Sequence, residues 1–237
     1  MEGSANSGIV SALRQVRRNI ASYETRYART PGSVRLLAVS KRKPIAAIRA
    51  AMDAGQQAFG ENYVEEGVKK ILSLDDAAID WHFIGAIQSR KTASIAEYFN
   101  WAHGVDRVKV ARRLSTQRPA GMPDLNICLQ VNVDSEPGKA GVSLGEIPAL
   151  AAACDNLPGL VLRGLMAIPA PRSDFAAQRE VFARMRQCLA SLSAAHPTMD
   201  TLSMGMSGDM EAAIAEGATI VRIGTAIFGS RDTQDEH

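Results

Sequence analysis

The stretch RLLAVSKRKPIAAIRAAMDAGQQAFG, residues 35 to 60, decides the fold class of this sequence. Its first part is apolar and alternating, which predicts a strand over residues 34–40, and Pro44 precedes a run with helical spacing over residues 45–54. QQAFG, residues 56–60, predicts a second short strand. A strand, a helix and a second strand in this order are typical of a parallel βαβ unit.

The same order repeats along the rest of the sequence. Further strands are predicted at residues 81–85, 100–105, 125–133, 160–168, 201–205 and 219–224. Helices are predicted at residues 64–74, 90–98, 107–116, 145–154, 174–195 and 209–216. Eight strands, each followed by a helix or a helical turn, favour a single (β/α)8 barrel of the TIM type. An open doubly wound sheet is the alternative, although no GxGxxG follows the first strand.

An extra amphipathic helix precedes these units. Apolar residues recur at helical spacing over residues 8–28, and we expect this helix to pack on the outside of the barrel or to cap its bottom. No linker or low-complexity segment interrupts the chain. We therefore assign residues 1–237 to one domain, structured over about residues 8–232, with a flexible tail at residues 233–237.

The composition is that of an ordinary globular protein, with 46% hydrophobic and 22% charged residues. The net charge of +2 gives no electrostatic case for nucleic acid, and we expect a monomer. No apolar run is long enough to span a membrane, and no signal peptide is visible, so we expect a cytoplasmic location. Three widely spaced cysteines argue against a disulfide framework and against a metal site.

The functional face of such a barrel lies at the C-terminal ends of its strands. By strand alternation Leu37, Val39 and Lys41 share one face. If that face points inward, the Lys41 amine enters the mouth of the barrel. Desolvation would then lower its pKa and make it a nucleophile for imine chemistry. The other interpretation is a lysine whose ammonium group reaches solvent at the strand end.

Two loops rich in serine and glycine follow the last two predicted strands. TLSMGMSGDM, residues 201–210, places Ser207 where it could cap the next helix, and VRIGTAIFG, residues 221–229, places Gly224 and Thr225 in a short turn. Barrels often bind phosphate at this position, where bare backbone N–H groups attract an anion. The first loop could also be no more than a capped turn.

Arg222 adds a cation to these loops. Alternation places Ile220, Arg222 and Gly224 on one face, and a guanidinium inside a barrel needs a partner. That partner could be a carboxylate such as Glu61 or an acceptor on a ligand. An amine, an anion site and an inward arginine together indicate a phosphorylated aldehyde, for which pyridoxal phosphate (PLP) is the obvious candidate.

Several long motifs resemble one known family. They are LLAVSK, FGENYVEE, WHFIGAIQSRK, LRGLMAIPAP and LSMGMSGDMEAAIAEGATIVRIGTAIFG. They are similar to those of the pyridoxal-phosphate homeostasis proteins, the YggS/PROSC family, over about residues 9–232. The resemblance implies a barrel like the N-terminal domain of alanine racemase that binds PLP without established turnover.

The resemblance also implies roles for individual residues. Lys41 of AVSK would be the imine lysine, and Ser207, Gly224 and Thr225 would hold the phosphate. Arg222 would face the pyridine nitrogen.

Two further residues are assigned less directly. Asn62 of GENYV and His82 of WHFIG would line the surroundings of the ring, although His82 could equally be a core histidine. Members of the family often end in a lysine-bearing tail, whereas the last lysine here is Lys139. Lys139 and Lys43 remain candidates for a secondary or transfer site.

The residue types favour a carrier over an enzyme. An arginine opposes protonation of the pyridine nitrogen, which makes the cofactor a weaker electron sink. Alanine racemase takes its second base, a tyrosine, from another domain; here only Tyr63 is expected near the mouth. We therefore predict a protein that holds PLP as an imine on Lys41, takes part in PLP homeostasis and delivers PLP to apo-enzymes. The alternatives are a slow racemase or lyase with Lys41 as sole base, and a barrel for some other phosphate.

Overall fold

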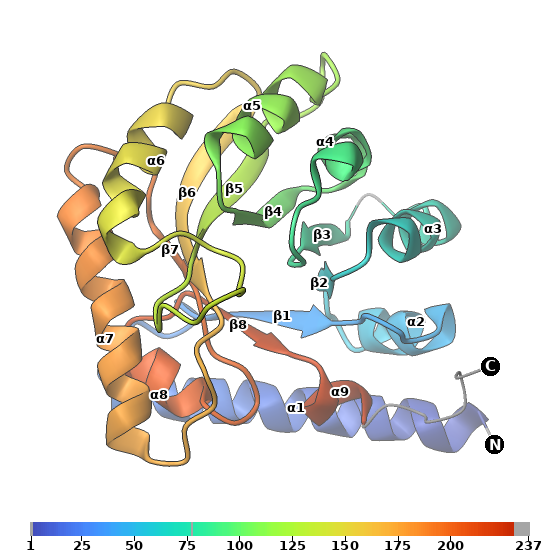
Figure 1. Ribbon diagram of the computed structural model, residues 1–237. Coiled ribbons are helices and arrows are strands. Elements are labelled where there is room, and N and C mark those ends of the chain that lie inside the picture. Colours follow the sequence, from blue (N-terminus) through green and yellow to red (C-terminus); the bar gives the residue numbers. More distant parts are fainter. Residues whose placement is uncertain (1, 77, 230–237) are drawn as a thin grey trace.

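The computed structural model describes residues 2–76 and 78–229, with side chains from residue 7 onward. Within these residues eight parallel strands pair in sequence order, and β1 pairs with β8 to close a barrel (Figure 1). The strands are β1 Arg35–Val39, β2 Ala58–Glu61, β3 Asp80–Phe83, β4 Trp101–Val105, β5 Leu125–Val131, β6 Leu160–Ala167, β7 Thr201–Ser203 and β8 Ile220–Ile223. The prediction of a single TIM-type barrel is confirmed.

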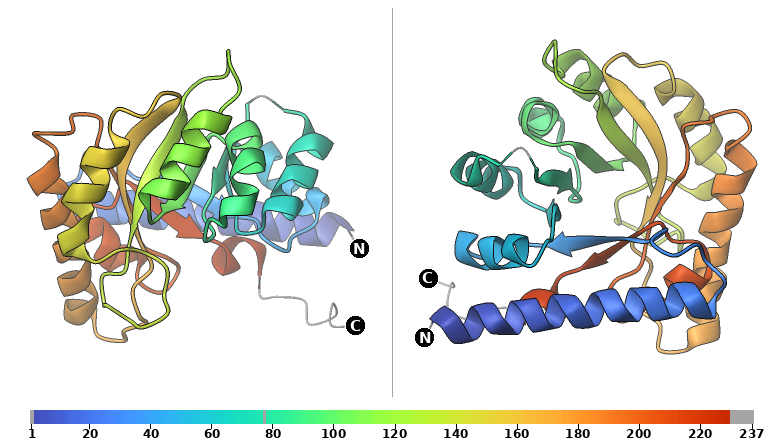
Figure 2. Two further views of the ribbon diagram at one scale, coloured as in Figure 1. Left: turned by 45° about the horizontal axis from the view of Figure 1, so that its top comes forward. Right: turned by 180° about the vertical axis from the view of Figure 1, so that it is seen from behind.

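Helices surround the strands as a ring (Figure 1). They are α2 Ile45–Asp53, α3 Val64–Leu74, α4 Thr92–Tyr98, α5 Val108–Gln117, α6 Ile147–Cys154, α7 Phe175–Leu192, α8 Met210–Ala215 and the short α9 Thr225–Phe228. The 3-10 turns η1 Ser89–Lys91 and η2 Leu144–Glu146 precede α4 and α6. The first helix, α1 Glu2–Arg26, lies across the outside of the barrel against α2, α8 and α9 (Figure 2). It is the extra helix that the sequence predicts.

Most boundaries agree with the sequence to within two residues, with two exceptions in the helices. α1 begins at Glu2 rather than at residue 8, because apolar spacing marks only the part of a helix that packs. α7 ends at Leu192 rather than at residue 195, because the chain turns ahead of Pro197. The last residues predicted as structured, 230–232, and the predicted tail at 233–237 lie outside the described residues.

The strand that the sequence predicts over residues 56–60 lies two residues later, in β2. The buried amide of Gln56 donates to the carbonyl oxygens of Leu36 and Ala58 at 2.9 and 2.8 Å. These bonds take Gln56 out of the strand and close the turn that enters β2. The residue that the sequence assigns to the start of the strand thus lies in the turn that precedes it.

The core has two parts, one on each side of the barrel wall. Large side chains such as Phe59 and Phe83 pack between the strands and the helices. A smaller cluster, which includes Leu37, Cys128 and Ile220, fills the inside of the barrel. Leu37 and Ile220 therefore lie on the inner face that strand alternation predicts.

Neither a membrane-spanning helix nor a cluster of metal-ligating side chains occurs among the described residues. No helix among them is long and apolar enough to cross a membrane. No group of three or more histidine, cysteine, aspartate and glutamate residues in this part of the chain is placed to hold a metal ion. All three cysteines are free thiols.

Candidate ligand-binding site

The structure brings most of the predicted site residues to one end of the barrel. Lys41 and Asn62 follow β1 and β2, Ser207 follows β7, and Gly224 and Thr225 follow β8. β7, β8, β1 and β2 are consecutive neighbours in the closed barrel. Because all strands are parallel, these residues lie on a continuous arc at the C-terminal end.

Lys41 lies half-buried in a tight turn directly after β1. Val39, the last strand residue, packs against the inner cluster, and the N–H of Lys43 donates to the carbonyl oxygen of Ser40 at 3.0 Å. Arg42 has a φ of 57°, the left-handed region, which redirects the chain. The strand thus ends two residues before Lys41, and the turn rather than the strand ladder sets the direction of its backbone.

A buried ionic cluster fixes the residue before Lys41. The Ser40 hydroxyl donates to Glu61 Oε1 at 2.6 Å. The ammonium of Lys70 donates to the Ser40 carbonyl oxygen at 2.7 Å and to Glu61 Oε1 at 2.8 Å. Burial raises the pKa of Glu61, although the charge of Lys70 opposes this effect. The cluster lies on the outer side of the barrel wall, beneath α3.

The same cluster also fixes the residue after Lys41. Lys70 donates to Glu66 Oε1 at 2.6 Å, and the same oxygen accepts the N–H of Arg42 at 2.5 Å. Both neighbours of Lys41 are therefore tied to the Lys70 ammonium, Ser40 directly and Arg42 through Glu66. The sequence reasoning missed Lys70, yet a signal was present, because Lys70 falls on the buried face of α3 with Val64.

Arg222 is buried inside the barrel and bonds the ends of β6 and β7. Its Nη1 donates to the carbonyl oxygen of Ser203 at 2.5 Å and to Ser203 Oγ at 2.9 Å, and its Nη2 donates to the carbonyl oxygen of Ala167 at 2.8 Å. Burial lowers its pKa to about 10. Glu61, the protein partner considered from the sequence, does not meet it. Gly60 faces the inner cluster, so Glu61 next to it faces outward.

The loop after β7 differs from its prediction in one respect. Ser207 does not cap the next helix, since α8 begins after Asp209. The Asp209 carboxylate instead accepts the N–H of Met206 at 2.6 Å and closes a turn around Ser207. Ser207 is exposed on the tip of this turn, where its N–H is open to a ligand.

Unused backbone donors gather in the two loops after β7 and β8. Within the described residues no protein acceptor meets the N–H groups of Ser207, Gly208, Thr225 and Ala226. The two loops are adjacent, because the N–H of Arg222 donates to the carbonyl oxygen of Gly205 at 2.9 Å. Such a set of open N–H groups suits an anion.

Two buried amide oxygens near the strand ends have no partner among the described residues. They are Asn62 Oδ1 and Gln130 Oε1. The backbone of Asn62 packs closely against Gly85, where an added Cβ would lie 2.3 Å from the Asn62 carbonyl oxygen. Gln130 was not predicted from the sequence, although it shares the parity of Cys128, which faces the inside of the barrel.

His82 lies inside the barrel rather than in a strand-end loop. Its side chain is fully buried, its ring stacks on Trp101 with centroids 5.1 Å apart, and its Nδ1 lies 2.9 Å from His103 Nε2. Burial lowers the pKa of both histidines, and that of His103 lies well below its usual value. Burial therefore favours the neutral form of both rings.

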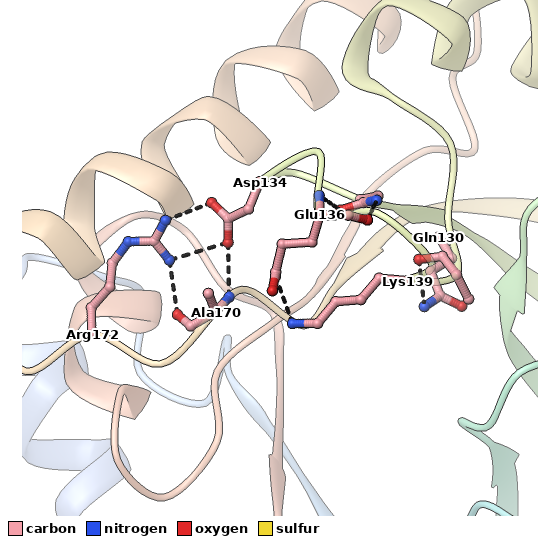
Figure 3. Close-up of polar contacts among 8 residues, drawn as sticks. Gln130, Asp134, Glu136, Lys139, Ala170 and Arg172 are labelled. Carbon is pink, nitrogen blue, oxygen red and sulfur yellow. Dashed lines mark hydrogen bonds and ion pairs between the residues drawn. The ribbon is translucent and has the colours of Figure 1, made fainter.

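The loop after β5 carries Lys139 at the same end of the barrel (Figure 3). Asp134 binds the guanidinium of Arg172 at 2.5 Å and accepts the N–H of Ala170 at 2.8 Å, which ties the loop to the segment after β6. Lys139 is exposed and donates to Glu136 Oε1 at 2.6 Å. Lys43, the other candidate amine, lies half-buried in the turn after Lys41.

Comparison with known proteins covers nearly the whole chain. The family described as "Alanine racemase, N-terminal domain" matches residues 12–232. The pyridoxal phosphate homeostasis protein of Escherichia coli (strain K12) is 53% identical over 227 residues, which cover 94% of this chain and 97% of that protein. The protein of the same name from Pseudomonas aeruginosa is 55% identical over 226 residues, which cover 95% of this chain and 97% of that protein.

Solved structures agree with this assignment. The structure of PipY from Synechococcus elongatus with PLP bound has a TM-score of 0.81 and 37% identity, and the match covers 93% of this chain and all of PipY. Alanine racemase from Corynebacterium glutamicum has a TM-score of 0.70 at 15% identity, covering 96% of this chain and 64% of that chain, and shares the fold. The chain therefore belongs to the family of pyridoxal phosphate homeostasis proteins, which the sequence motifs indicated.

Proposed function

We propose that this protein binds PLP at the C-terminal end of its barrel and takes part in PLP homeostasis. Lys41 holds the cofactor covalently, and the protein releases it to PLP-dependent apo-enzymes without substantial turnover of its own. The names of the relatives and the PLP in the PipY structure support this proposal. One observation carries it: an amine, a buried guanidinium and four open backbone N–H groups lie on neighbouring strands or in the loops that follow them.

The residues present suit the three parts of PLP. The open N–H groups around Ser207 and Thr225 suit a phosphate dianion, because they can donate to it without first breaking a protein bond. Half-buried Lys41 offers an amine for the aldehyde. Arg222 offers a guanidinium for the pyridine nitrogen, and the unpartnered oxygen of Asn62 can accept from a ligand donor.

When bound, PLP supplies an aldehyde that a lysine amine converts to an imine with loss of water. Other residues of the chain position Lys41 and Arg222 for this step. Lys70 and Glu66 fix the turn that presents Lys41. Arg222, held by two backbone carbonyl groups, is a rigid donor toward the ring.

Two features favour a protein that holds PLP over an enzyme that uses PLP to turn over a substrate. Arg222 places a cation where an enzyme that needs a strong electron sink places a carboxylate. Tyr63, the tyrosine expected near the mouth, is 45% exposed, and its hydroxyl accepts a hydrogen bond from Arg42 at 3.2 Å. It is a surface residue rather than a desolvated base.

The covalent assignment is tested with purified protein and added PLP. We expect the imine absorbance band, and after borohydride reduction we expect mass spectrometry to find the added mass on the peptide that carries Lys41. Lys41→Ala should lose both signals, whereas Lys43→Ala, two residues along the same turn, should keep them. An unchanged band in Lys41→Ala would overturn the assignment of the lysine.

The same preparations distinguish the alternatives. Sustained racemisation or decarboxylation of an amino acid, abolished in Lys41→Ala, would favour a slow enzyme. Binding of inorganic phosphate without any binding of PLP would favour a barrel for another phosphate ligand. Transfer of PLP to an apo-enzyme faster than PLP dissociates into buffer would support delivery by contact.

A further inference from the structure

A line of polar side chains crosses the inside of the barrel. Arg222 Nη1 donates to Ser203 Oγ at 2.9 Å, and Ser203 Oγ lies 2.8 Å from His103 Nδ1. His103 Nε2 lies 2.9 Å from His82 Nδ1. His82 Nε2 in turn lies 3.3 Å from Asp80 Oδ2, although it has no aligned hydrogen bond among the described residues. The line thus joins the ligand end of the barrel to its opposite end.

The two ends of this line are in different surroundings. Arg222, Ser203, His103 and His82 are all buried. Asp80, the first residue of β3, is partly exposed and binds Arg35 at 2.7 Å. Arg35 lines a surface groove of about 430 Å³ between the barrel and α1. Only the Asp80 end therefore has access to water at the bottom of the barrel.

The hydrogen positions follow from what each group can donate. A guanidinium can only donate, so Ser203 Oγ accepts from Arg222. His103 Nδ1 is the other partner of this hydroxyl among the described residues, so the hydroxyl hydrogen is satisfied by donation to that nitrogen. Neutral His103 then carries its hydrogen on Nε2 and donates it to His82 Nδ1. Neutral His82 is left with its hydrogen on Nε2.

The Asp80 end of the line independently indicates the same tautomer for His82. A carboxylate can only accept, and Asp80 Oδ2 lies near His82 Nε2, so the hydrogen of His82 belongs on Nε2. This leaves a lone pair on His82 Nδ1, which accepts from His103 Nε2. Both ends thus favour the same tautomer in both rings.

We infer that His82 and His103 are positioning residues that connect Arg222 to Asp80 through Ser203, with both imidazoles fixed as their Nε2–H tautomers. Every group in the line presents a lone pair toward its neighbour on the Arg222 side. The negative ends of these dipoles therefore point to the guanidinium. No carboxylate in the described part of the chain is within ion-pair distance of Arg222. The charge of Asp209 opposes the lowering of the Arg222 pKa by burial, and the line adds dipoles whose negative ends face the guanidinium.

This inference deepens the proposed function at one point, since Arg222 is the residue that would face the pyridine nitrogen. An arginine tied to Ser203 and to the line behind it stays cationic and keeps one orientation. The pyridine ring of bound PLP would then face the Arg222 guanidinium in the same orientation in every protein molecule. The tautomers themselves exist without a ligand and can be measured without one.

The direct test is nitrogen-15 NMR of the ligand-free full chain at neutral pH. The sequence has four histidines, so the long-range ring correlations are few enough to assign with His82→Gln and His103→Gln variants. We expect His82 and His103 each to show a single Nε2–H tautomer. An Nδ1–H tautomer, a mixture of tautomers or a protonated ring at either position would overturn the inference.

The link to Arg222 is tested by PLP affinity in three variants. His103→Phe and Ser203→Ala break the line, and His196→Phe is the control, because His196 is also buried beside a carboxylate, Asp155, but lies outside the barrel interior. We expect PLP binding to weaken about two- to tenfold in the first two variants, the range expected for one lost hydrogen bond. The control should bind as the wild type does.

The possible results separate the two proposals. If the wild-type protein binds no PLP, the proposed function fails, while the NMR result still decides the tautomers. If PLP binds and the first two variants bind as tightly as the control, the line does not position Arg222. Should His103→Phe fail to fold, Ser203→Ala removes only a hydroxyl group and still gives the answer.

Discussion

The ammonium nitrogen of Lys70 donates a hydrogen bond of 2.7 Å to the carbonyl oxygen of Ser40, the residue directly before Lys41. Lys70 lies on α3, outside the barrel wall, whereas the proposed ligand lies at the end of the barrel. The bond therefore joins the helical layer to the turn that carries the proposed imine lysine. The orientation of Lys41 depends on a charge that no ligand would touch.

Replacing Lys70 with methionine removes this charge and keeps a similar volume. Glu61, which is fully buried, then loses its ammonium partner. Because an unpaired buried charge is costly, we expect the free energy of unfolding to fall by about 3 kcal/mol. We also expect less imine absorbance at limiting PLP, because the turn around Lys41 loses its anchor. Urea unfolding and absorbance titration measure the two effects.

The control for this change is Lys69→Met, on the next residue of the same helix. Lys69 is exposed, so we expect its replacement to change the free energy of unfolding by less than about 0.5 kcal/mol. Equal stability of the two variants would mean that the buried cluster contributes nothing.

Glu61 gives the stability of the protein a pH dependence of its own. Burial raises its pKa above the unfolded value of about 4.3, so folding favours the protonated form. Its contribution is fully present below that unfolded pKa and is lost as the pH rises through the folded pKa. We therefore expect Glu61→Gln to gain stability relative to the wild type as the pH rises, measured by urea unfolding at several pH values. A constant difference across pH would contradict the raised pKa.

The pH dependence that Asp134 gives to the stability should have the opposite sign to that of Glu61. Burial tends to raise its pKa, but the hydrogen bonds from Arg172 and from the Ala170 N–H outweigh this and lower it. Its contribution is present above the unfolded pKa of about 3.9 and is lost as the pH falls through the folded value. We expect Asp134→Asn to lose about 2 kcal/mol at neutral pH and much less in acid. Thermal unfolding across pH measures the difference, and a loss that grows in acid would contradict it.

A substitution at Gly85 tests its close approach to the backbone of Asn62. An alanine there would place its Cβ 2.3 Å from the Asn62 carbonyl oxygen, so the ends of β2 and β3 would have to separate. We expect Gly85→Ala to cost about 1–3 kcal/mol and to weaken PLP binding. Gly145→Ala is the matched control, because nothing lies within 4 Å of its added Cβ. If the two variants unfold at the same urea concentration, the approach is not a constraint.

Periodicity explains why the fold could be predicted so fully. Leu37 and Ile220 alternate inward and the βα order repeats eight times, and both features are local in sequence. The place of a candidate site residue could be predicted where the residue lies in a loop that follows a strand. Lys41, Asn62, Ser207, Gly224 and Thr225 satisfy that rule, because strand ends meet at one face whatever the details of packing.

Pairing between distant residues could not be predicted in the same way. Arg222 bonds Ser203 rather than Glu61, and His82 meets His103, because barrel closure and strand register decide which side chains face each other. The role of Lys70 could not be predicted from the sequence for another reason. A lysine on an apolar helix face looks like an exception until its three acceptors, two of them buried, are known.

The pairing of β1 with β8 has a consequence for how the protein is made in the cell. Lys41 follows the first strand to leave the ribosome, and the loop of Gly224 and Thr225 follows the last. Until β8 has been synthesised, the first strand has an open edge and the proposed site lacks its phosphate loop and its arginine. We therefore expect a partly made chain to bind PLP far more weakly than the finished barrel.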